Sequence, residues 1–479
     1  MLSFVRNYSI LPKTIKSLSK EVSSSTNHVQ HVKGWIKSVR LLKNIAFIDL
    51  QDGTCTDALK VCIPIENSKE TEYVRRLKTG QSVSITNAQC KMTPEREQSF
   101  ELKISEPLKS ISIIGNVTLD YPLQKKAHSL SFLRTQPTLK HRSSYLSSLM
   151  RFRSHLELSL FNFFQEHDFT KVSPPVLTSS DCEGAGELFK VQSSSRDNDS
   201  YFGKPTYLTV STQLHLEIMA MALSRCYTLT PCFRAERSDT NRHLSEFWML
   251  ESEISFVDSV LELTRFVEEM LKNSIKSCYE QKNELLPIIT PDNSLTREEI
   301  LKRWESLLHK AWATISYTEA IGILKKQHAM VPFPNYEPKW GESLQTEHEK
   351  WLAGEHFESP VFVTDYPRDC KAFYMKANSE ELPGNETVAC FDLLVPEMGE
   401  IVGGSMREDN YDSLSREMAR RKMNSSGELT WYLKLRSEGT IPHGGFGLGL
   451  ERLASYLFGS HNIKDAIPFH RSASGSIEL

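Results

Sequence analysis

The chain has 479 residues, 39% of them hydrophobic and 24% charged, which is long enough for two or three domains and ordinary for a soluble protein. Its formal net charge of −3 excludes a globally basic nucleic-acid binder, so any bound nucleic acid must contact local basic patches. The nine cysteines form no C-x-x-C pair and no apolar run reaches membrane length, which argues against a zinc ribbon, a disulfide framework and a membrane protein.

The first 20 residues are basic and rich in hydroxyl groups. They contain Arg6, Lys13, Lys16 and Lys20, several serines and no acidic residue. This composition is typical of a mitochondrial transit peptide, although Pro12 interrupts any single helix. We therefore expect residues 1–24 to direct the chain to the mitochondrial matrix, and the alternative is a disordered basic tail.

A block rich in predicted β-strands follows, over residues 25–118. Short runs separated by turn residues predict a small closed barrel of the OB type. These runs are residues 31–40, 45–53, 58–65, 81–90 and 100–105. Such barrels bind single-stranded nucleic acid by stacking bases on aromatic side chains beside basic groups. The candidates for these contacts are Trp35, Arg40, Phe47, Lys60, Phe100 and Glu101.

A second domain is predicted over residues 143–479, after a basic, proline-containing hinge at residues 119–142. It begins with an amphipathic helix, followed by the run DFTKVSPPVL. One face of this helix carries Leu156, Leu160, Phe163 and Phe164. A later amphipathic helix, packed on a core, is predicted from the spacing of Leu263, Val267, Leu271 and Ile275.

Residues 233–251, FRAERSDTNRHLSEFWMLE, predict two strands joined by a polar loop. Alternation places Arg234 and Glu236 on one face of the first strand. The matching face of the second strand carries Phe247, Met249 and Glu251. The loop adds Arg237, Arg242 and His243, so arginines and an aromatic ring can bind the phosphates and base of a nucleotide without a P-loop. A charged hairpin with a solvated loop is the alternative.

A second hairpin is predicted at residues 391–408, FDLLVPEMGEIVGGSMRE, with its turn at Pro396 and Gly399. It brings Asp392 and Glu400 toward the end of one hairpin. Hard carboxylate oxygens suit Mg²⁺ that bridges ATP phosphates. The sequence does not give the strand register, so nothing in the pattern itself places both carboxylates on one face.

Glycines alternate in the run HGGFGLGLERL, residues 443–453. In a strand, Gly445, Gly447 and Gly449 leave one face bare, and a purine can lie flat on it. The opposite face, with Phe446, Leu448 and Leu450, is predicted to point into the core. Arg452 follows at the start of a helix, where it can reach phosphate or the ring. Leu450 replaces the third glycine of G-x-G-x-x-G, so the run is not the dinucleotide fingerprint; a glycine-kinked core strand is the alternative.

Together these segments resemble the class II aminoacyl-tRNA synthetases. FRAE to FWMLE resembles motif 2, GFGLGLERL resembles motif 3, and the helix before DFTKVSPPVL, with Pro175, resembles motif 1. The class I signatures HIGH and KMSKS are absent. The resemblance implies an α+β fold, in which an N-terminal OB-type barrel precedes a catalytic domain with an antiparallel sheet flanked by helices. It also implies a homodimer.

The run TSSDCEGAGELF, residues 178–189, resembles the asparaginyl subgroup of class IIb more than the aspartyl one. Leu216 stands where aspartyl enzymes carry a lysine for the substrate carboxylate. The resemblance therefore implies ATP-dependent attachment of asparagine to tRNA(Asn) through asparaginyl-AMP. An aspartyl-tRNA synthetase, discriminating or not, and an inactive synthetase-like RNA-binding protein remain the alternatives.

The same resemblance implies roles for individual residues. Arg234 and Arg452 would be catalytic. The asparagine site would comprise Glu183, Ser211, Gln213, Glu236 and Arg407. The ATP site would comprise Arg234, Glu236, Arg242, His243, Leu244, Phe247, Glu400, Gly449 and Arg452. Mg²⁺ would bind Asp392 and Glu400, and the tRNA anticodon would bind Arg40, Phe47, Lys60 and Glu101, although Lys60 stands where glutamine is expected.

Overall fold

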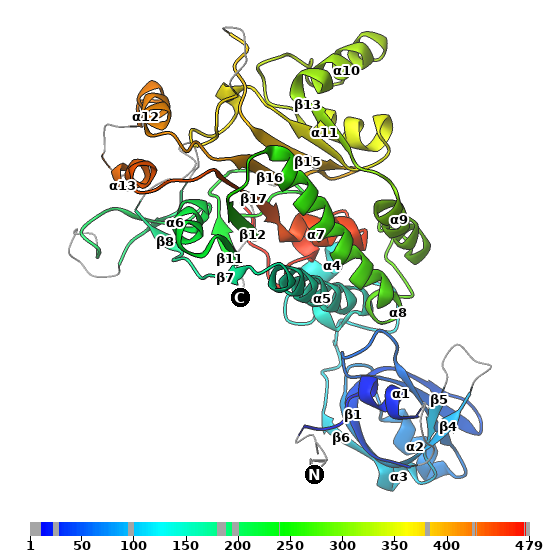
Figure 1. Ribbon diagram of the computed structural model, residues 1–479. Helices are drawn as coiled ribbons and strands as arrows, with labels where there is room; N and C mark the ends of the chain where they lie inside the picture. The colour runs from blue at the N-terminus through cyan, green and yellow to red at the C-terminus, as the bar shows by residue number, and fades with distance from the viewer. Residues whose placement is uncertain are drawn as a thin grey trace, which may run out of the picture. The chain divides into compact units, whose positions relative to one another are not determined.

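The computed structural model of the chain describes residues 11–22, 28–93, 100–179, 188–193, 201–238, 240–378, 384–423, 427, 429–473 and 475. Two compact units are present, and their elements are labelled in Figure 1. The first comprises Met1–Ser148 with Lys282–Asp292, and the second comprises Leu149–Gln281 with Asn293–Leu479. In the described part of the chain, every helix is too short or too polar to cross a membrane.

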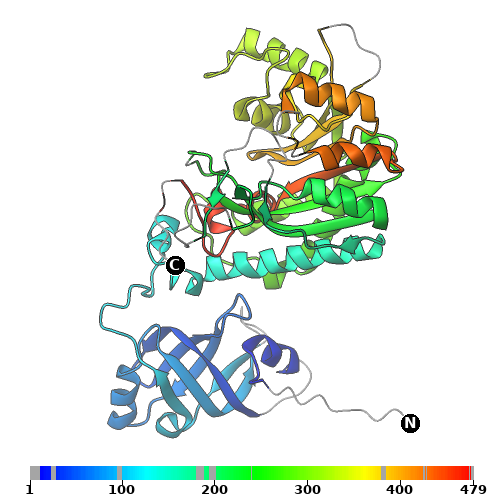
Figure 2. The same ribbon diagram turned by 90° about the vertical axis from the view of Figure 1, so that its left-hand side faces the viewer.

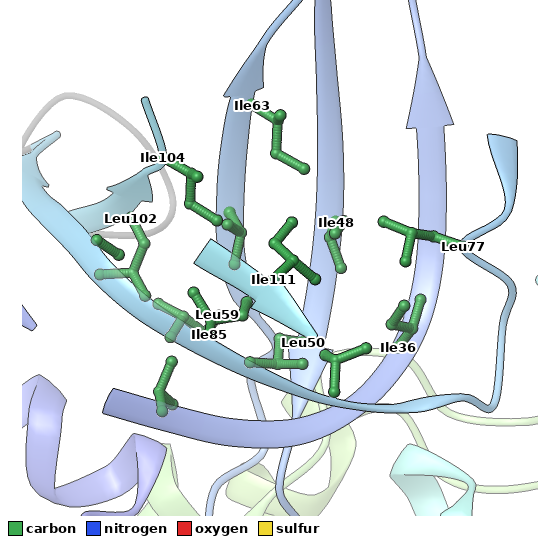
Figure 3. Close-up of a cluster of buried hydrophobic side chains, with 14 of the residues drawn as sticks. Ile36, Ile48, Leu50, Leu59, Ile63, Leu77, Ile85, Leu102, Ile104 and Ile111 are labelled. Carbon is green, nitrogen blue, oxygen red and sulfur yellow. The ribbon is translucent and has the colours of Figure 1, made fainter. Parts of the chain in front are cut away.

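The first unit is an OB-type barrel. Its strands are β1 (His28–Leu41), β2 (Ile45–Gln51), β3 (Leu59–Pro64), β4 (Ser82–Met92), β5 (Phe100–Lys103) and β6 (Ile111–Gly115). The sheet order is β1-β2-β3-β5-β4-β6, and β1 also pairs with β4, so the curved strands close on themselves (Figure 2). Alternate apolar side chains fill the interior, among them Ile36, Ile48, Leu50 and Leu102 (Figure 3). The predicted barrel is confirmed.

Helices complete this unit. They are α1 (Ile15–Val22), α2 (Ser68–Arg75), α3 (Pro107–Ser110), α4 (Leu130–Arg134), η1 (Lys140–Arg142) and α8 (Lys282–Leu285). The sequence analysis did not identify α2, which begins where the Asn67 side chain accepts a hydrogen bond from the backbone N–H of Glu70. One member, α1, lies inside the predicted leader.

Helix α1 packs as part of the barrel. Ile15 and Leu18 are each 3% exposed and belong to the same buried cluster as the strand side chains. The backbone N–H of Ile15 also donates to Asp52 Oδ2 at 2.7 Å, and Lys16 forms an ion pair with Glu284. A leader that ended at residue 24 would therefore include a helix that the folded barrel uses.

The second unit is built on an eight-stranded sheet of order β13-β14-β15-β16-β17-β12-β11-β7. Its strands are β7 (Thr170–Lys171), β11 (Arg225–Phe233), β12 (Glu246–Ser255), β13 (Ala313–Ser316), β14 (Val361–Thr364), β15 (Cys390–Val395), β16 (Gly399–Met406) and β17 (His443–Gly449). Pairing is antiparallel from β14 to β11 and parallel at both edges. A small sheet, β8 (Leu177–Thr178), β10 (Thr206–Leu208) and β9 (Lys190–Val191), lies apart from it in the topology.

Two long helices cover one face of this sheet (Figure 1). They are α5 (Ser144–Glu166) and α7 (Val260–Glu280), and both were predicted from their apolar spacing. Phe163 and Phe164 of α5 contact Phe266 of α7, which in turn contacts Phe446 of β17. Because Phe446 points to this face, the alternating glycines of β17 must point to the other.

The remaining helices of the second unit surround the sheet. They are α6 (Gln213–Leu223), α9 (Arg297–His309), α10 (Tyr317–Met330), α11 (Thr346–Trp351), η2 (Leu352–His356), η3 (Arg368–Cys370), α12 (Tyr411–Arg420), α13 (Thr430–Lys434), η5 (Leu435–Ser437), α14 (Leu450–Phe458) and η6 (Ile463–Asp465). Helix α14 begins directly after the glycine strand, as predicted.

Candidate active site

The strand register builds a bare floor on the face of the sheet opposite α5 and α7. Glu251 of β12 lies opposite Gly447, Gly447 lies opposite Gly403, and Gly403 lies opposite Asp392. Residues opposite one another share a face, so two glycines stand between two carboxylates. A Cβ added at Gly447 would meet nothing closer than the Met249 sulfur, at 3.4 Å. The position above Gly447 therefore has room for a methyl group in ordinary contact with Met249 and Glu251.

The first half of the hairpin at residues 233–251 differs from the prediction. Strand β11 ends at Phe233, so Arg234 and Glu236 lie in the irregular segment beyond it instead of on a strand face. The strand is formed by the preceding run, Arg225–Phe233, which pairs along its whole length with β12. The Arg234 guanidinium nevertheless lies over the Phe247 ring, 5.6 Å from its centroid. Its Nη1 is 3.9 Å from Glu236 Oε1.

Four cations converge on Glu400, on β16. Arg452 Nη1 lies 3.7 Å from Glu400 Oε2 and donates to the Glu400 backbone oxygen at 3.0 Å. Burial opposes ionisation of Glu400, but Arg452, Lys371, Arg234 and Arg242 together lower the pKa of its carboxyl. Motifs far apart in the sequence thus bring guanidinium and ammonium groups to one place. Such a cluster suits a polyphosphate.

Three carboxylates lie within this cationic ring. A Cβ added at Gly403 would lie 3.1 Å from Glu400 Oε1 and 3.4 Å from Asp392 Oδ1, so both carboxylates point at the same spot. An irregularity in the β15–β16 register at Leu393 and Leu394 brings them together. Lys371 Nζ donates to both oxygens of Asp392, at 2.6 and 2.7 Å.

Glu349 of α11 is the third carboxylate, and the sequence analysis missed it. It accepts a hydrogen bond from the Glu400 backbone N–H at 3.3 Å and lies 3.7 Å from Arg242 Nη2. Burial and the nearby Glu400 raise the pKa of Glu349 to about 7. Arg242 is also held by Thr346, whose Oγ1 accepts from Nη1 at 2.8 Å. No motif marks Glu349 or Lys371, because both come from segments without a repeating pattern.

The loop between β11 and β12 fixes its histidine through hydroxyl groups. His243 Nδ1 is 2.6 Å from Thr240 Oγ1 and 3.2 Å from Ser238 Oγ. Burial and the positive charge of Arg452 lower the pKa of His243, so the ring is neutral near neutral pH. Leu244 beside it is buried.

Hydrogen-bonding side chains gather at the start of α6. Ser211 Oγ donates to Glu251 Oε1, and the Thr212 backbone N–H donates to Glu251 Oε2 at 2.9 Å. Helix α6 begins at Gln213, and Gln213 Nε2 donates to Glu217 Oε1 at 3.1 Å. Glu183 lies outside the described residues. Leu216 is 1% exposed and packs in an apolar cluster with Ala220 and Cys226.

A buried charge network lies next to Gln213, and the sequence analysis identified only Arg407 in it. Arg407 donates from Nε and Nη2 to Glu253, at 3.0 and 2.8 Å. Glu217 accepts from Arg436, at 2.8 Å, and from the Tyr432 hydroxyl, at 2.8 Å. Although burial opposes its charge, Glu253 and Glu217 raise the pKa of Arg407 above its usual value. Arg407 therefore stays a cation.

The barrel carries its own candidate site. Arg40 lies opposite Phe47, and Lys60 lies opposite Asp49, so these side chains share the outer face of β1, β2 and β3. Lys60 and Glu101 line a hollow of about 340 Å³, together with Lys37, Asp49, Phe100 and other residues of this unit. Lys37 and Asp49 carried no distinguishing signal in the sequence.

Known proteins are similar to this chain over nearly its whole length. A family model described as tRNA synthetases class II (D, K and N) matches residues 130–473. A protein from Saccharomyces cerevisiae named asparagine–tRNA ligase, mitochondrial, is 58% identical, over 99% of this chain and 98% of that protein. One of the same name from Schizosaccharomyces pombe is 42% identical, over 98% of each. The solved asparaginyl-tRNA synthetase from Pyrococcus horikoshii, complexed with asparaginyl-adenylate, matches with a TM-score of 0.81 at 28% identity, over 98% of this chain and 99% of that one.

Proposed function

We propose that this chain, which belongs to the class II tRNA synthetases (D, K and N), is an asparagine–tRNA ligase that activates asparagine with ATP and transfers it to tRNA(Asn). The observation that carries the proposal is the bare floor at Gly447 and Gly403. Four cations lie at one end of it, and the hydrogen-bonding groups of α6 lie at the other. A nucleotide and a small polar amino acid would bind side by side there.

ATP lies on the glycine face with its adenine beside Phe247, Gly449 and Arg452. Arg234 stabilises the charge that develops on the α-phosphate, while Arg242 and His243 hold the outer phosphates. Glu236 and the backbone of the buried Leu244 are the remaining residues proposed to contact ATP on this side of the site. Little proton transfer is needed, because the attacking carboxylate of asparagine is already ionised. It displaces pyrophosphate in line, and the terminal ribose hydroxyl of tRNA then attacks the adenylate.

Asp392 and Glu400 are the residues that would hold Mg²⁺. Their oxygens converge over Gly403, and hard carboxylate ligands are those that Mg²⁺ prefers. When bound, the ion would supply positive charge that stabilises the phosphates. Glu349 helps to position Glu400 by accepting a hydrogen bond from its backbone N–H. Lys371 neutralises part of the charge on Asp392.

Asparagine binds between the floor and α6. Glu183 accepts from its α-ammonium group, and Ser211 and Gln213 add hydrogen bonds beside Glu251. Arg407 and Glu236 face the side-chain amide. The support for this part is the convergence of α6, β12 and β16 on one end of the floor.

The barrel reads the anticodon of tRNA(Asn). Phe47 stacks on one base, and Arg40, Lys60 and Glu101 contact its neighbours, because they share the outer face of the barrel. The chain acts as a homodimer, in which α5 and the strand after it form the interface. The domain boundaries proposed are residues 25–118 together with helix α1 for the barrel, 119–142 for the hinge and 143–479 for the catalytic domain.

The enzyme works in mitochondria, as the names of two relatives state for those proteins, and we place it in the matrix. The basic start of the chain is its import signal. Because Ile15 and Leu18 pack in the barrel core, the removed leader ends before α1 and is shorter than the 24 residues expected from composition.

The test is ATP–pyrophosphate exchange with the purified full chain and each amino acid in turn. Exchange that depends on asparagine, at a rate well above that with any other amino acid, is expected. Exchange that requires aspartate instead of asparagine, or exchange that proceeds without any amino acid, would refute the proposal.

A further inference from the structure

A small cavity adjoins the cationic cluster of the candidate active site, and Arg242 contributes to both. Its volume is about 80 Å³. Ser455 and Tyr456 line it from α14, one helical turn after Arg452, and so lie on the same face of that helix as Arg452. The lining also includes exposed side chains, those of Asn241, Glu397 and His461. The cavity therefore extends the phosphate side of the site along α14 and reaches solvent.

Two hydrogen-bonding atoms of residues at this cavity have no partner in the part of the chain that the structure describes. They are Ser455 Oγ and Arg242 Nε, and both are buried. The Ser455 side chain is 0% exposed, and its hydroxyl does not bond to a carbonyl of the preceding turn, as serines within helices often do. Buried polar atoms in folded proteins nearly always have a partner. Two such atoms beside one cavity therefore point to a bound group as their partner.

Lys350, which follows Glu349 on α11, adds a positive charge to the same cavity. Its ammonium group has no ion-pair partner among the described residues. The nearby acids are already engaged, because Glu397 pairs with Arg303 and Glu349 lies 3.7 Å from Arg242. Burial and the charge of Arg242 lower the pKa of Lys350, although Glu349 and Glu397 oppose this shift. The cavity thus carries positive charge that the acids of the protein do not neutralise.

A ligand for this cavity must accept hydrogen bonds and carry negative charge. The Arg242 Nε–H and the Lys350 ammonium can only donate, and the Ser455 hydroxyl can donate as well. A volume of about 80 Å³ holds about three water molecules at roughly 30 Å³ each, which leaves room for one phosphoryl group but not for a nucleoside. The proposed reaction produces such an anion next to the cavity, because cleavage of ATP releases pyrophosphate beside Arg242.

We propose, on the basis of the proposed function, that this cavity is a binding site for the released pyrophosphate on its way to solvent, in which Lys350, Ser455 and Arg242 Nε bind one phosphoryl group. The asparagine carboxylate forms the new bond to the α-phosphorus. The bond between that phosphorus and the bridging oxygen breaks, and its electron pair leaves with pyrophosphate. Intact ATP stops short of the cavity, because its outer phosphates are still bonded to AMP. Lys350 is thus a product-binding residue that no sequence motif identifies.

The experiment measures pyrophosphate binding by isothermal titration calorimetry. The full chain is first saturated with asparaginyl sulfamoyl adenosine, a stable mimic of asparaginyl-AMP, so that only the product side remains open. Lys350→Met removes the charge and keeps an unbranched side chain, and it should raise the Kd for pyrophosphate by about tenfold or more. The Kd of the free enzyme for ATP should stay close to that of the unaltered chain. Lys350→Arg keeps the charge and should retain most of the affinity for pyrophosphate.

Ser455→Ala separates binding from folding. Because the Ser455 hydroxyl has no partner in the protein, its removal breaks no internal hydrogen bond, and the thermal midpoint should stay equal or rise. The same variant should bind pyrophosphate several-fold more weakly. A normal Kd for pyrophosphate in both Ser455→Ala and Lys350→Met would show that only water fills the cavity, and would overturn the proposal.

Lys325→Met is the matched control, because it removes the same charge from an exposed position on α10 that does not line the cavity. Its Kd for pyrophosphate should match that of the unaltered chain, and an equal loss in this variant would overturn the proposal by showing a general effect of net charge. A loss of ATP affinity in Lys350→Met as large as the loss for pyrophosphate would also overturn it, since Lys350 would then belong to the ATP site.

Failure of the proposed function would look different. An unaltered chain that binds the aspartyl analogue of the mimic and not the asparaginyl one would refute the asparagine assignment. The pyrophosphate titrations would then be repeated with that analogue bound, and the effects expected for Lys350→Met and Ser455→Ala would be the same, because the cavity contacts the product and not the amino acid.

Discussion

Gly447→Ala should strongly weaken the use of ATP and leave the fold intact. The added Cβ would meet only side-chain atoms, of Met249 at 3.4 and 3.9 Å and of Glu251 at 4.0 Å, which is ordinary van der Waals contact. Gly447 has no positive φ, so alanine fits its backbone. Loss of glycine also reduces the freedom of the unfolded chain, and the free energy of unfolding should stay equal or rise by up to about 1 kcal/mol.

The same methyl group would occupy the floor on which the ligand is proposed to lie. Lifting a bound ligand by about 1 Å costs on the order of a hundredfold in rate. We therefore expect kcat/KM for ATP in asparagine-dependent pyrophosphate exchange to fall by at least about a hundredfold, while the thermal midpoint stays equal or rises slightly. Differential scanning fluorimetry and the exchange assay measure the two effects on one sample.

Gly445→Ala provides the contrast on the same strand. Its Cβ would stand 2.1 Å from the Ser252 backbone oxygen and 2.2 Å from Glu253 Oε2, distances that no small adjustment relieves. This variant should be severely destabilised, whereas Gly447→Ala should not. Near-normal exchange by Gly447→Ala, at a normal thermal midpoint, would refute the reasoning that the nucleotide lies on this face.

Three further outcomes are expected. Arg452→Ala should lower asparagine-dependent exchange by about a hundredfold to a thousandfold, or roughly 3–4 kcal/mol, without altering circular dichroism; normal exchange would contradict its role at the phosphates. Deletion of residues 1–10 should leave the urea midpoint unchanged, whereas deletion of residues 1–24 removes Ile15 from the barrel core and should lower it; equal midpoints would show that α1 is dispensable. Burial opposes ionisation of Glu417, but hydrogen bonds from three arginines lower its pKa to about 2, so its contribution to stability is present above pH of about 4.5 and is lost as pH falls toward 2. Glu417→Gln should lack this acid-dependent loss in urea titrations, and an identical pH profile in both proteins would argue against it.

Periodic patterns in the sequence were sufficient for most of the fold. The alternating glycines of β17 and the apolar spacing of α5 and α7 report directly which residues face a core, and the structure confirms all three elements. The barrel was predictable for the same reason. Strand β11 was placed too late because the charged residues Arg234 and Glu236 beyond it are spaced two apart, whereas the residues that pair with β12 are those of Arg225–Phe233.

Some residues of the candidate site could not be predicted from the sequence, because their positions depend on the register between strands and on segments distant in the chain. The irregularity at Leu393 and Leu394 decides whether Asp392 and Glu400 share a face, and a shift of one residue would separate them. Glu349 and Lys371 reach the site from α11 and from the segment after η3, where no spacing singles them out. The counter-ion of Arg407 was equally hidden, because Glu253 looks like any residue of an alternating strand.

Leu216 shows a different limit of prediction from sequence. The family resemblance identified it as the position of an absent cation, and the structure buries it among Ala220 and Cys226. Leu216→Lys would therefore place an amine in an apolar cluster, and a loss of stability would accompany any change in specificity.

The most direct test of the central claim is aminoacylation of a tRNA(Asn) transcript by the purified full chain, with the attached amino acid identified by mass spectrometry. With equal concentrations of asparagine and aspartate and with ATP present, asparaginyl-tRNA should be almost the sole product. Aspartyl-tRNA as a main product would establish the aspartyl alternative, and uncharged tRNA under these conditions would contradict a ligase function altogether.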